Sequence, residues 1–275
     1  MIPIAYITEW SAHAPWRSPL MVEQDLVISR AVLELFSNPF LRDHLAFRGG
    51  TALYKLCLLP AARYSEDIDL VQLAAEPLRE TMDHMHTTLD PWLGSPRYSA
   101  TRQSARLLYR YEAETAPGVM RRVKIEINTR EHLPHEHTVR YPFTIASRWV
   151  EGTGQVTSFA LDELLGTKMR ALYQRCKGRD LFDLDYALRS GKAHPAHILA
   201  AFVRYVSRQG LRITAAMFRA NLQEKLAAPR FADDISPLLR DSVTFTLADA
   251  VERLEADLLS RLDAAWLDSA TVQTV

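Results

Sequence analysis

The stretch from residue 47 to residue 73, FRGGTALYKLCLLPAARYSEDIDLVQL, constrains the fold more than any other part of the chain. Its pattern predicts a short strand, a Gly-Gly turn, a helix, a basic loop and a second strand. Side chains alternate between the two faces of a strand. Asp67 and Asp69 are therefore expected to share one face of the second strand, while Ile68 and Leu70 enter a core.

These residue types together indicate a nucleotide site. Two adjacent carboxylates repel each other unless a cation binds them, and their oxygens suit Mg²⁺, with Mn²⁺ as the alternative ion. Gly is scarce, at 10 of 275 residues, and Gly49 and Gly50 can bring backbone N–H groups and a helix N-terminus against a phosphate. We predict that Asp67 and Asp69 are catalytic and metal-binding. The alternative is that they are ordinary surface acids at a strand end.

The sequence GGTAL followed by RYSEDIDL resembles the DNA polymerase β-type nucleotidyltransferase superfamily and, more narrowly, the AbiEii/MenT family of bacterial toxin–antitoxin and abortive-infection toxins. The resemblance covers residues 47–73 and 161–188. It implies an α+β, bilobed fold in which a polymerase β-like mixed sheet with flanking helices is followed by a C-terminal helical domain.

Two domains are expected, a nucleotidyltransferase core over residues 1–157 and a helical domain over 158–275 that completes the active-site cleft. The chain is long enough for two modest cores. Strand patterns fall at 45–48, 68–73, 106–112, 121–128 and near Val156, and Gly152-Thr153-Gly154 is predicted to be a turn. Helix patterns fall at 18–36, 51–58, 76–92, 159–176, 180–190, 194–208, 214–227 and 244–265.

A third carboxylate is predicted on the strand over 121–128. Val123, Ile125 and Ile127 share one face there, which puts Glu126 on the polar face with Lys124 and Asn128. The superfamily carries a third carboxylate on a later strand, so Glu126 is a candidate metal ligand. A solvent-facing strand Glu is the alternative interpretation. The loop histidines of HLPHEH are expected to be surface residues; they are His132, His135 and His137.

A lysine interrupts the apolar face of the predicted helix that begins near Leu161. Leu164, Leu165 and Leu172 form an apolar arc with Lys168 at its centre, whereas four polar residues are predicted to face solvent: Glu163, Thr167, Arg170 and Gln174. A lysine among apolar residues must extend its amine to water or meet an anion. We predict that Lys168 reaches a phosphate.

The following segment, KGRDLFDLDYAL, carries three aspartates with different expected roles. Asp180 is predicted to be a helix N-cap and Asp185 to be solvated. Asp183 is expected to face protein and to pair with Lys168. The resemblance implies that this lysine and the downstream aspartate, Asp183, complete the catalytic site.

The implied activity is Mg²⁺-dependent transfer of an NMP from an NTP to an RNA acceptor, with the tRNA 3′ end favoured and translation blocked as a result. Gly49, Gly50 and Thr51 are expected to contact the triphosphate, and Arg63 and Ser65, with Lys168, its oxygens. Two alternatives stay open: transfer to a protein hydroxyl, or a non-catalytic nucleotide-binding partner protein. A cognate antitoxin is the expected protein partner, and phosphorylation of Ser65 is one way it could act.

The net charge of zero conceals a basic region, because residues 97–130 hold eight Lys or Arg against three acids. Such a region is compatible with a polyanion on one face, and a solvated mixed surface is the alternative. No apolar run approaches the roughly 20 residues that span a bilayer, the N-terminus does not match a secretory signal, and Cys57 and Cys176 lack metal-ligand spacing. We expect a cytoplasmic protein without membrane contact.

Overall fold

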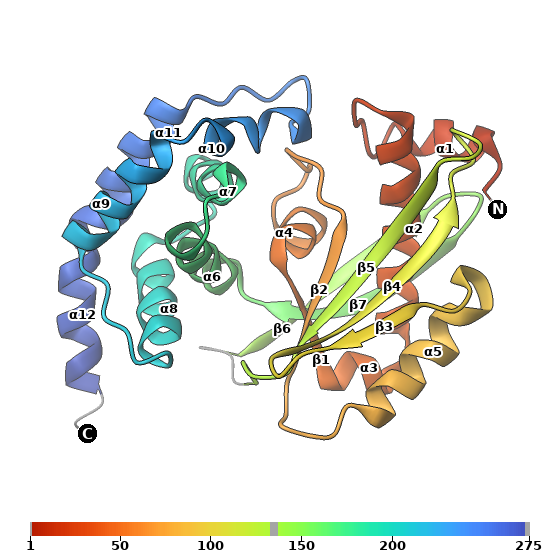
Figure 1. Cartoon of the computed structure of the whole chain (residues 1–275), viewed down its shortest axis with the longest axis horizontal. Helices are drawn as coiled ribbons and strands as arrows, with labels where there is room; N and C mark the ends of the chain where they lie inside the picture. Colours follow the sequence, from red (N-terminus) through yellow and green to blue (C-terminus); the bar gives the residue numbers. More distant parts are fainter. Residues whose placement is uncertain (1, 133–136, 273–275) are drawn as a thin grey trace. The chain divides into compact units, whose positions relative to one another are not determined.

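The computed structural model describes residues 2–132 and 137–272. The backbone divides into two compact units, Met1–Phe159, here called the sheet unit, and Ala160–Val275, the helical unit. Figure 1 shows the strands gathered in the first of these and only helices in the second. None of the helices in the described ranges is both long and apolar enough to cross a membrane.

A mixed sheet of seven strands forms the centre of the sheet unit, in the order β3-β4-β5-β2-β1-β7-β6. The strands are β1 (Leu45–Arg48), β2 (Asp67–Gln72), β3 (Arg97–Ala100), β4 (Ser104–Glu112), β5 (Met120–Asn128), β6 (Thr138–Ala146) and β7 (Glu151–Phe159). β2 runs parallel to β5 and β1 parallel to β7, whereas the other neighbours are antiparallel. The expected mixed sheet is confirmed, and β2, which carries Asp67 and Asp69, lies next to β5, which carries Glu126.

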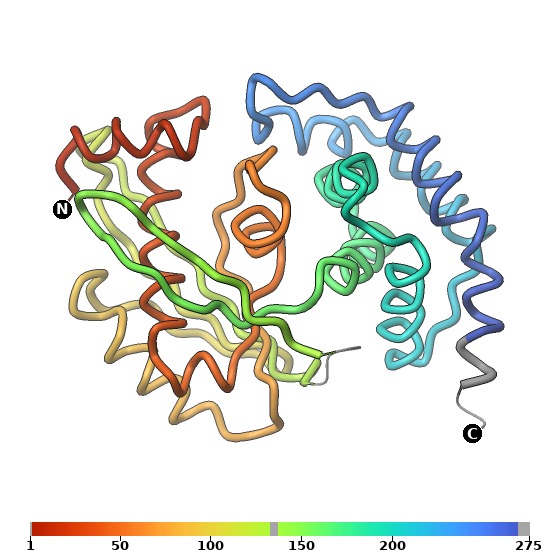
Figure 2. The backbone as a smooth tube through the Cα atoms, turned by 180° about the vertical axis from the view of Figure 1, so that it is seen from behind, coloured from red at the N-terminus to blue at the C-terminus, as the bar shows by residue number. Residues whose placement is uncertain are grey.

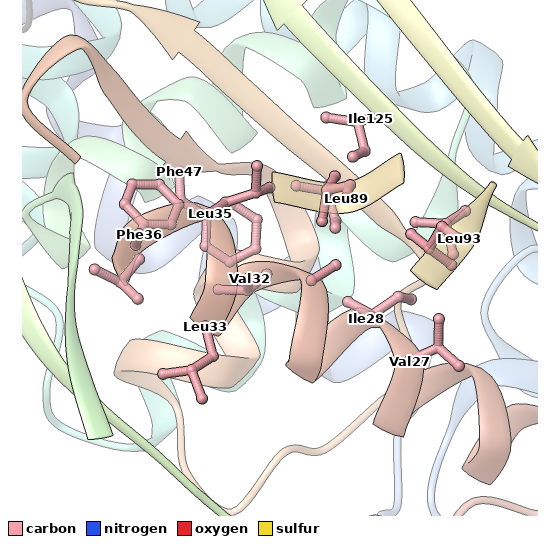
Figure 3. Close-up of a cluster of buried hydrophobic side chains, with 14 of the residues drawn as sticks. Val27, Ile28, Val32, Leu33, Leu35, Phe36, Phe47, Leu89, Leu93 and Ile125 are labelled. Atoms are coloured by element: carbon pink, nitrogen blue, oxygen red, sulfur yellow. The ribbon is translucent and has the colours of Figure 1, made fainter. Parts of the chain in front are cut away.

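The core lies between the sheet and its helices. The helical elements of the unit are α1 (Ile4–Trp10), α2 (Pro19–Ser37), α3 (Pro39–His44), α4 (Gly49–Ala52), the π-helical turn η1 (Leu53–Cys57) and α5 (Arg79–Leu93). Figure 3 shows apolar side chains of α2 and α5 meeting Phe47 of β1 and Ile125 of β5. Both of these strand residues are fully buried, as the alternation along each strand requires.

The predicted Gly152-Thr153-Gly154 turn is wrong, because these residues lie inside β7. β7 pairs along its whole length with β6 in a long hairpin, drawn in green in Figure 2. A Cβ at Gly152 would lie 2.9 Å from Leu33 of α2, so the missing side chain lets the helix pack closely on the strand. Pro142 interrupts no central pairing, because β6 is an edge strand.

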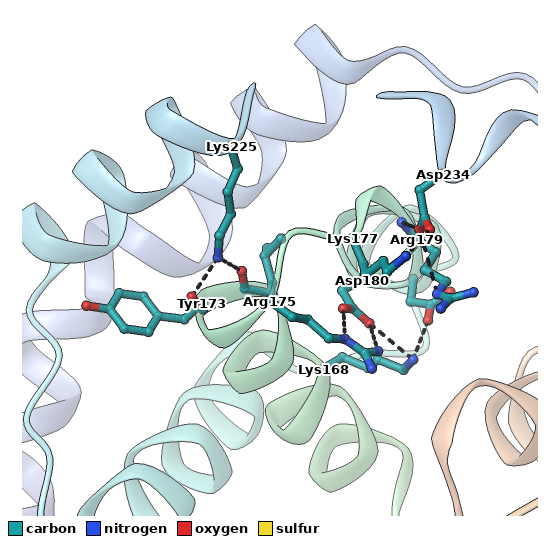
Figure 4. A network of polar contacts seen from close by, with 10 residues as sticks. Lys168, Tyr173, Arg175, Lys177, Arg179, Asp180, Lys225 and Asp234 are labelled. Atoms are coloured by element: carbon teal, nitrogen blue, oxygen red, sulfur yellow. Dashed lines mark hydrogen bonds and ion pairs between the residues drawn. The ribbon is translucent and has the colours of Figure 1, made fainter. Parts of the chain in front are cut away.

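The helical unit holds α6 (Leu161–Gln174), α7 (Gly178–Arg189), α8 (Pro195–Ser207), α9 (Ala215–Leu226), α10 (Pro229–Asp233), η2 (Ser236–Leu238), α11 (Leu247–Leu254), η3 (Glu255–Leu259) and α12 (Ser260–Val272). A Cβ at Gly166 of α6 would lie 2.6 Å from the Cβ of Ala201 in α8. These two helices therefore approach each other with almost no side chain between them. Lys225 of α9 donates to the carbonyl oxygens of Leu172 and Tyr173 at the end of α6 (Figure 4).

Two residues of α6 predicted to face solvent are buried instead. Glu163 is 2% exposed and its Oε1 accepts a hydrogen bond of 2.7 Å from the Tyr205 hydroxyl. Arg170 is 8% exposed and its guanidinium lies 5.0 Å from the ring centroid of the same tyrosine. The helical wheel of α6 does not show that α8 packs against this face. Tyr205 of α8 contacts both Glu163 and Arg170 there.

Candidate functional site

The predicted carboxylates lie in register on two neighbouring strands. β2 and β5 are parallel, and Asp67 pairs with Lys124 while Asp69 pairs with Glu126. Residues directly opposite each other on paired strands point to the same face. The three carboxylates therefore share one face of the sheet, opposite the apolar core that receives Ile68 and Ile125.

Lys124 lies among these carboxylates and was not singled out from the sequence. Its Nζ is 2.9 Å from Asp67 Oδ2 and 3.6 Å from Glu126 Oε2. Burial alone would lower the pKa of Lys124, but the hydrogen bond to Asp67 and the charges of Asp67, Asp69 and Glu126 raise it above its ordinary value. The alternation of side chains along the strand predicted that Lys124 shares a face with Glu126. Its position opposite Asp67 depends on how β2 pairs with β5, which the sequence does not reveal.

Two side chains of β4 hold Glu126. Its Oε1 accepts from the Ser104 hydroxyl at 3.1 Å, and its Oε2 pairs with Arg106 Nη2 at 3.0 Å. Burial alone would raise the pKa of Glu126, but these hydrogen bonds and the charges of Lys124 and Arg106 lower it. Glu126 is thus an ionised carboxylate with fixed partners rather than a freely solvated strand residue.

The Gly-Gly turn lies directly against the carboxylate strand. Gly49 has a φ of +81°, and a Cβ built on it would lie only 2.4 Å from Asp69 Oδ2. Any other residue would meet both a strained backbone and the carboxylate. A Cβ at Gly50 would lie 2.5 Å from Arg63 and 2.9 Å from Ser65 Oγ. The two glycines leave room for these side chains beside the N-terminus of α4.

Internal hydrogen bonds fix the basic loop between η1 and β2. The Thr51 hydroxyl lies 2.9 Å from Ser65 Oγ and 2.5 Å from the Asp67 carbonyl oxygen. Arg63 is 2% exposed, donates from Nη1 to the Tyr64 carbonyl at 2.9 Å and stacks on Tyr54. All the residues predicted to form a nucleotide site in the sheet unit are therefore brought together.

A second charged cluster, whose two carboxylates are completely buried, lies in the helical unit. Lys168 Nζ is 2.9 Å from Asp183 Oδ2 and 3.4 Å from Asp180 Oδ1, and both carboxylates are 0% exposed. The predicted Lys168–Asp183 ion pair is present. Figure 4 shows Lys168, Arg175 and Asp180 turned toward one another at the junction of α6 and α7. We call Lys168, Asp180 and Asp183 the buried ion cluster; Arg175, whose side chain is 49% exposed, pairs with Asp180 from its solvent side.

Two predictions about the aspartates of α7 are wrong. Asp180 is inside the helix, not at its N-cap, and its carboxylate takes two hydrogen bonds of 2.6 and 2.8 Å from Arg175. Burial would raise the pKa of Asp180, but the charge of Lys168 and the contacts of Arg175 lower it. Asp185 is 3% exposed rather than solvated, and it pairs with Arg189 and with Arg253 of α11. The partner from α11 is distant in sequence and could not be anticipated.

The loop histidines form no metal group within the described residues. His132 Nδ1 lies 3.1 Å from the carbonyl oxygen of Gln72, and His135 lies outside the described residues. A group of three potential ligands occurs elsewhere, in the helical unit.

Comparison with known proteins identifies one family. A family model described as the nucleotidyl transferase AbiEii toxin of a type IV toxin–antitoxin system matches residues 30–257. A search of curated proteins found no match. Among solved structures, MenT4, a nucleotidyltransferase toxin from Mycobacterium tuberculosis H37Rv, is 20% identical with a TM-score of 0.65, covering 98% of this chain and 90% of its own. JHP933 from Helicobacter pylori is 16% identical with a TM-score of 0.51, covering 94% of this chain and 98% of its own.

Proposed function

We propose that this chain, which belongs to the AbiEii family of nucleotidyltransferase toxins, transfers an NMP from an NTP to the 3′ end of a tRNA and thereby blocks translation. The observation that carries the proposal is the close approach of the Gly49 turn to Asp69, where a Cβ on Gly49 would lie 2.4 Å from Oδ2, because it places a turn suited to a phosphate beside the carboxylate pair. An NTP and a cognate antitoxin are the partners that a toxin of this family requires.

The carboxylates of the sheet unit fit a divalent cation. Asp67, Asp69 and Glu126 are oxygen donors on one face, as Mg²⁺ and Mn²⁺ prefer, and Lys124 already supplies a compensating charge there. When bound, the ion would supply Lewis-acid activation of the attacking hydroxyl and charge stabilisation at the phosphates. Lys124 is the protein's own cation at this position, and its contact with Asp67 would have to open when a metal binds.

The remaining site residues are proposed to bind and orient the triphosphate. The backbone N–H groups of Gly49, Gly50 and Thr51 would meet its oxygens at the start of α4. Arg63 and Ser65 border the same turn and would neutralise or hydrogen-bond phosphate oxygens. Lys168 is proposed to add positive charge to the same reaction, with Asp183 holding its amine in one orientation.

An exposed basic face on β3, β4 and β5 supports a nucleic-acid acceptor. Arg110 and Arg122 lie directly opposite each other on paired strands and are both exposed. Two like charges in that arrangement are unfavourable unless an anion lies across them. Arg106 and Arg97, also exposed, extend the face toward the sheet edge. Basic side chains along strands would contact the phosphates of an RNA backbone without reading its sequence.

Ser65 is proposed as the residue through which the antitoxin acts. Its Oγ lies beside Gly50 and Thr51 and two residues before Asp67. A phosphoryl group there would add about 1.5 to 2 negative charges next to the carboxylates, which opposes triphosphate binding. Ser65→Asp should therefore abolish both toxicity and transfer, whereas Ser65→Ala, which loses one hydroxyl contact but adds no negative charge, should lose far less of either. Full activity in Ser65→Asp would refute this proposal.

The activity is tested by incubating the protein with each of the four labelled NTPs, Mg²⁺, total tRNA and a cell lysate. We expect label in the tRNA fraction, located at the 3′ end by nuclease mapping. Label in protein would replace the proposed acceptor with a protein hydroxyl. No label in either fraction, with retained nucleotide binding, would indicate a non-catalytic nucleotide-binding protein.

A further inference from the structure

Three potential metal ligands converge at the start of two helices in the helical unit. Asp162 lies in the first turn of α6, His194 immediately precedes α8, and His197 lies in the first turn of α8. None of the three belongs to the residues proposed for nucleotide transfer. Their side-chain ligand atoms all lie within 4.8 Å of one another.

Both imidazole rings lie close to the same carboxylate oxygen, Asp162 Oδ2. His194 Nδ1 lies 3.1 Å and His197 Nδ1 3.3 Å from Asp162 Oδ2. Two neutral rings held beside one carboxylate oxygen offer two nitrogen ligands and one oxygen ligand to a cation placed between them. This ligand set suits zinc and related divalent transition metals, whereas Mg²⁺ prefers oxygen alone.

The carboxylate is held in position by the backbone. Asp162 Oδ1 accepts a hydrogen bond of 2.9 Å from the His194 N–H, which leaves Oδ2 for the rings. The Asp162 side chain is only 13% exposed. An outer hydrogen bond of this kind orients a ligating carboxylate and is part of many metal centres.

The two helices that supply the ligands are fixed relative to each other. Gly166 of α6 lets the backbone of α8 approach so closely that a Cβ there would be 2.9 Å from the Phe202 nitrogen. Pro195 at the first position of α8 restricts the backbone next to His194. The spacing between Asp162 and the two histidines is thus set by packing, as a preformed site requires.

We propose that Asp162, His194 and His197 form a binding site for a zinc-class divalent cation, with water completing the coordination. The histidine side chains are 69% and 62% exposed, so ions can enter and the rings can rotate to bonds of about 2 Å. In the bound form each neutral ring carries its proton on Nε2 and offers the Nδ1 lone pair, so no proton need be released from it. The positive ends of two helix dipoles oppose the added charge, which favours micromolar over tighter affinity.

The test uses the full-length protein titrated with Zn²⁺ alone, followed by calorimetry and by competition with a zinc indicator dye. Wild type is expected to bind one ion that His197→Ala and Asp162→Asn bind at least about 10-fold more weakly. His86→Ala is the matched control, because His86 forms a one-histidine pair with Asp90, 2.9 Å apart, and lacks a second ring. A second readout replaces zinc with Co²⁺, whose visible absorption reports nitrogen and oxygen ligation.

The outcomes are distinct. Loss of the ion in the His197 and Asp162 variants but not in His86→Ala, with unchanged circular dichroism, supports the site. Equal zinc affinity in wild type and His197→Ala overturns it, as does Mg²⁺ binding that is as strong as zinc binding and is weakened in the same way by His197→Ala and Asp162→Asn. His197 is largely exposed, so His197→Ala should fold, and its result decides the proposal even if Asp162→Asn unfolds. Neither readout depends on nucleotide transfer.

Discussion

The sheet unit and the helical unit each contain a cluster of oppositely charged side chains, and the two clusters differ in their exposure to water. In the sheet unit the Asp67 and Glu126 side chains are 40% and 26% exposed. In the helical unit Asp180 and Asp183 are 0% exposed and share the ammonium of Lys168. Exposed carboxylates can exchange partners with a metal or nucleotide, whereas buried ones are costly to separate. These exposures support the proposal that the sheet-unit cluster binds a ligand, and they indicate that the buried ion cluster holds α6 and α7 together.

The largest effect on stability is expected from Lys168→Met. It removes the ammonium that compensates two fully buried carboxylates, and breaking such a cluster costs about 3–5 kcal/mol. Chemical denaturation of the variant measures this loss. Glu252→Ala, an exposed change in α11, is the control and should stay within about 0.5 kcal/mol of wild type. A Lys168→Met protein as stable as wild type would contradict a structural role.

Lys168→Arg sharpens the same contrast because it keeps the charge. If Lys168 also contributes to nucleotide transfer, as proposed, then Lys168→Arg should lose far more activity than stability. If activity and stability fell to a similar extent, Lys168 would have a structural role only.

An intermediate effect is expected from Gly49→Ala, which tests the turn beside Asp69. The positive φ by itself costs about 1–3 kcal/mol, and the new Cβ would also meet Asp69 Oδ2 at 2.4 Å. Gly94→Ala is the matched control, since Gly94 has a φ of +76° with nothing within 4 Å of its Cβ position. Both variants should lose stability, but only Gly49→Ala should lose nucleotide transfer. Equal transfer rates in Gly49→Ala and Gly94→Ala would show that the Gly49 turn does not contribute to nucleotide transfer.

The smallest effect concerns acid stability and Glu126→Gln. The pKa of Glu126 is lowered in the folded protein, so its stabilisation is present above the ordinary Glu pKa and is lost as the pH falls below it. The pair with Arg106 is partly exposed, so the contribution is less than about 1 kcal/mol. Thermal unfolding of both proteins should differ at neutral pH and converge in acid. If the stability difference between wild type and Glu126→Gln grew as the pH fell, the pKa of Glu126 would be raised rather than lowered by folding, contrary to this prediction.

Local sequence signals predicted the parts of the fold that depend on neighbouring residues. The strand Leu45–Arg48 was predicted at its observed bounds, because the Gly-Gly turn marks its end. The first strand of the β6–β7 hairpin was missed: β6 contains Pro142 and lies at the sheet edge, and the glycines of β7 resemble a turn. Their strand conformation depends on packing against α2, which no local pattern contains.

The candidate site, too, could be predicted from the sequence only in part. Alternation along single strands predicted the faces of Asp67, Asp69 and Glu126, but the register that inserts Lys124 among them comes from pairing two strands more than fifty residues apart. The same limit explains Asp185, whose buried charge is compensated by Arg253 across the helical unit. Sequence periodicity reveals which way a side chain points, not what meets it there.

The central claim is that the sheet-unit carboxylates perform chemistry rather than hold the fold. It is tested most directly by measuring the transfer rate and the free energy of unfolding on one preparation of Asp69→Asn, beside the control Asp43→Asn. Asp43 is an exposed aspartate of the same unit that pairs with Arg140. We predict that Asp69→Asn loses transfer at least about 100-fold while its stability changes by less than about 1 kcal/mol, and that Asp43→Asn keeps both. Undiminished transfer in Asp69→Asn would contradict the claim.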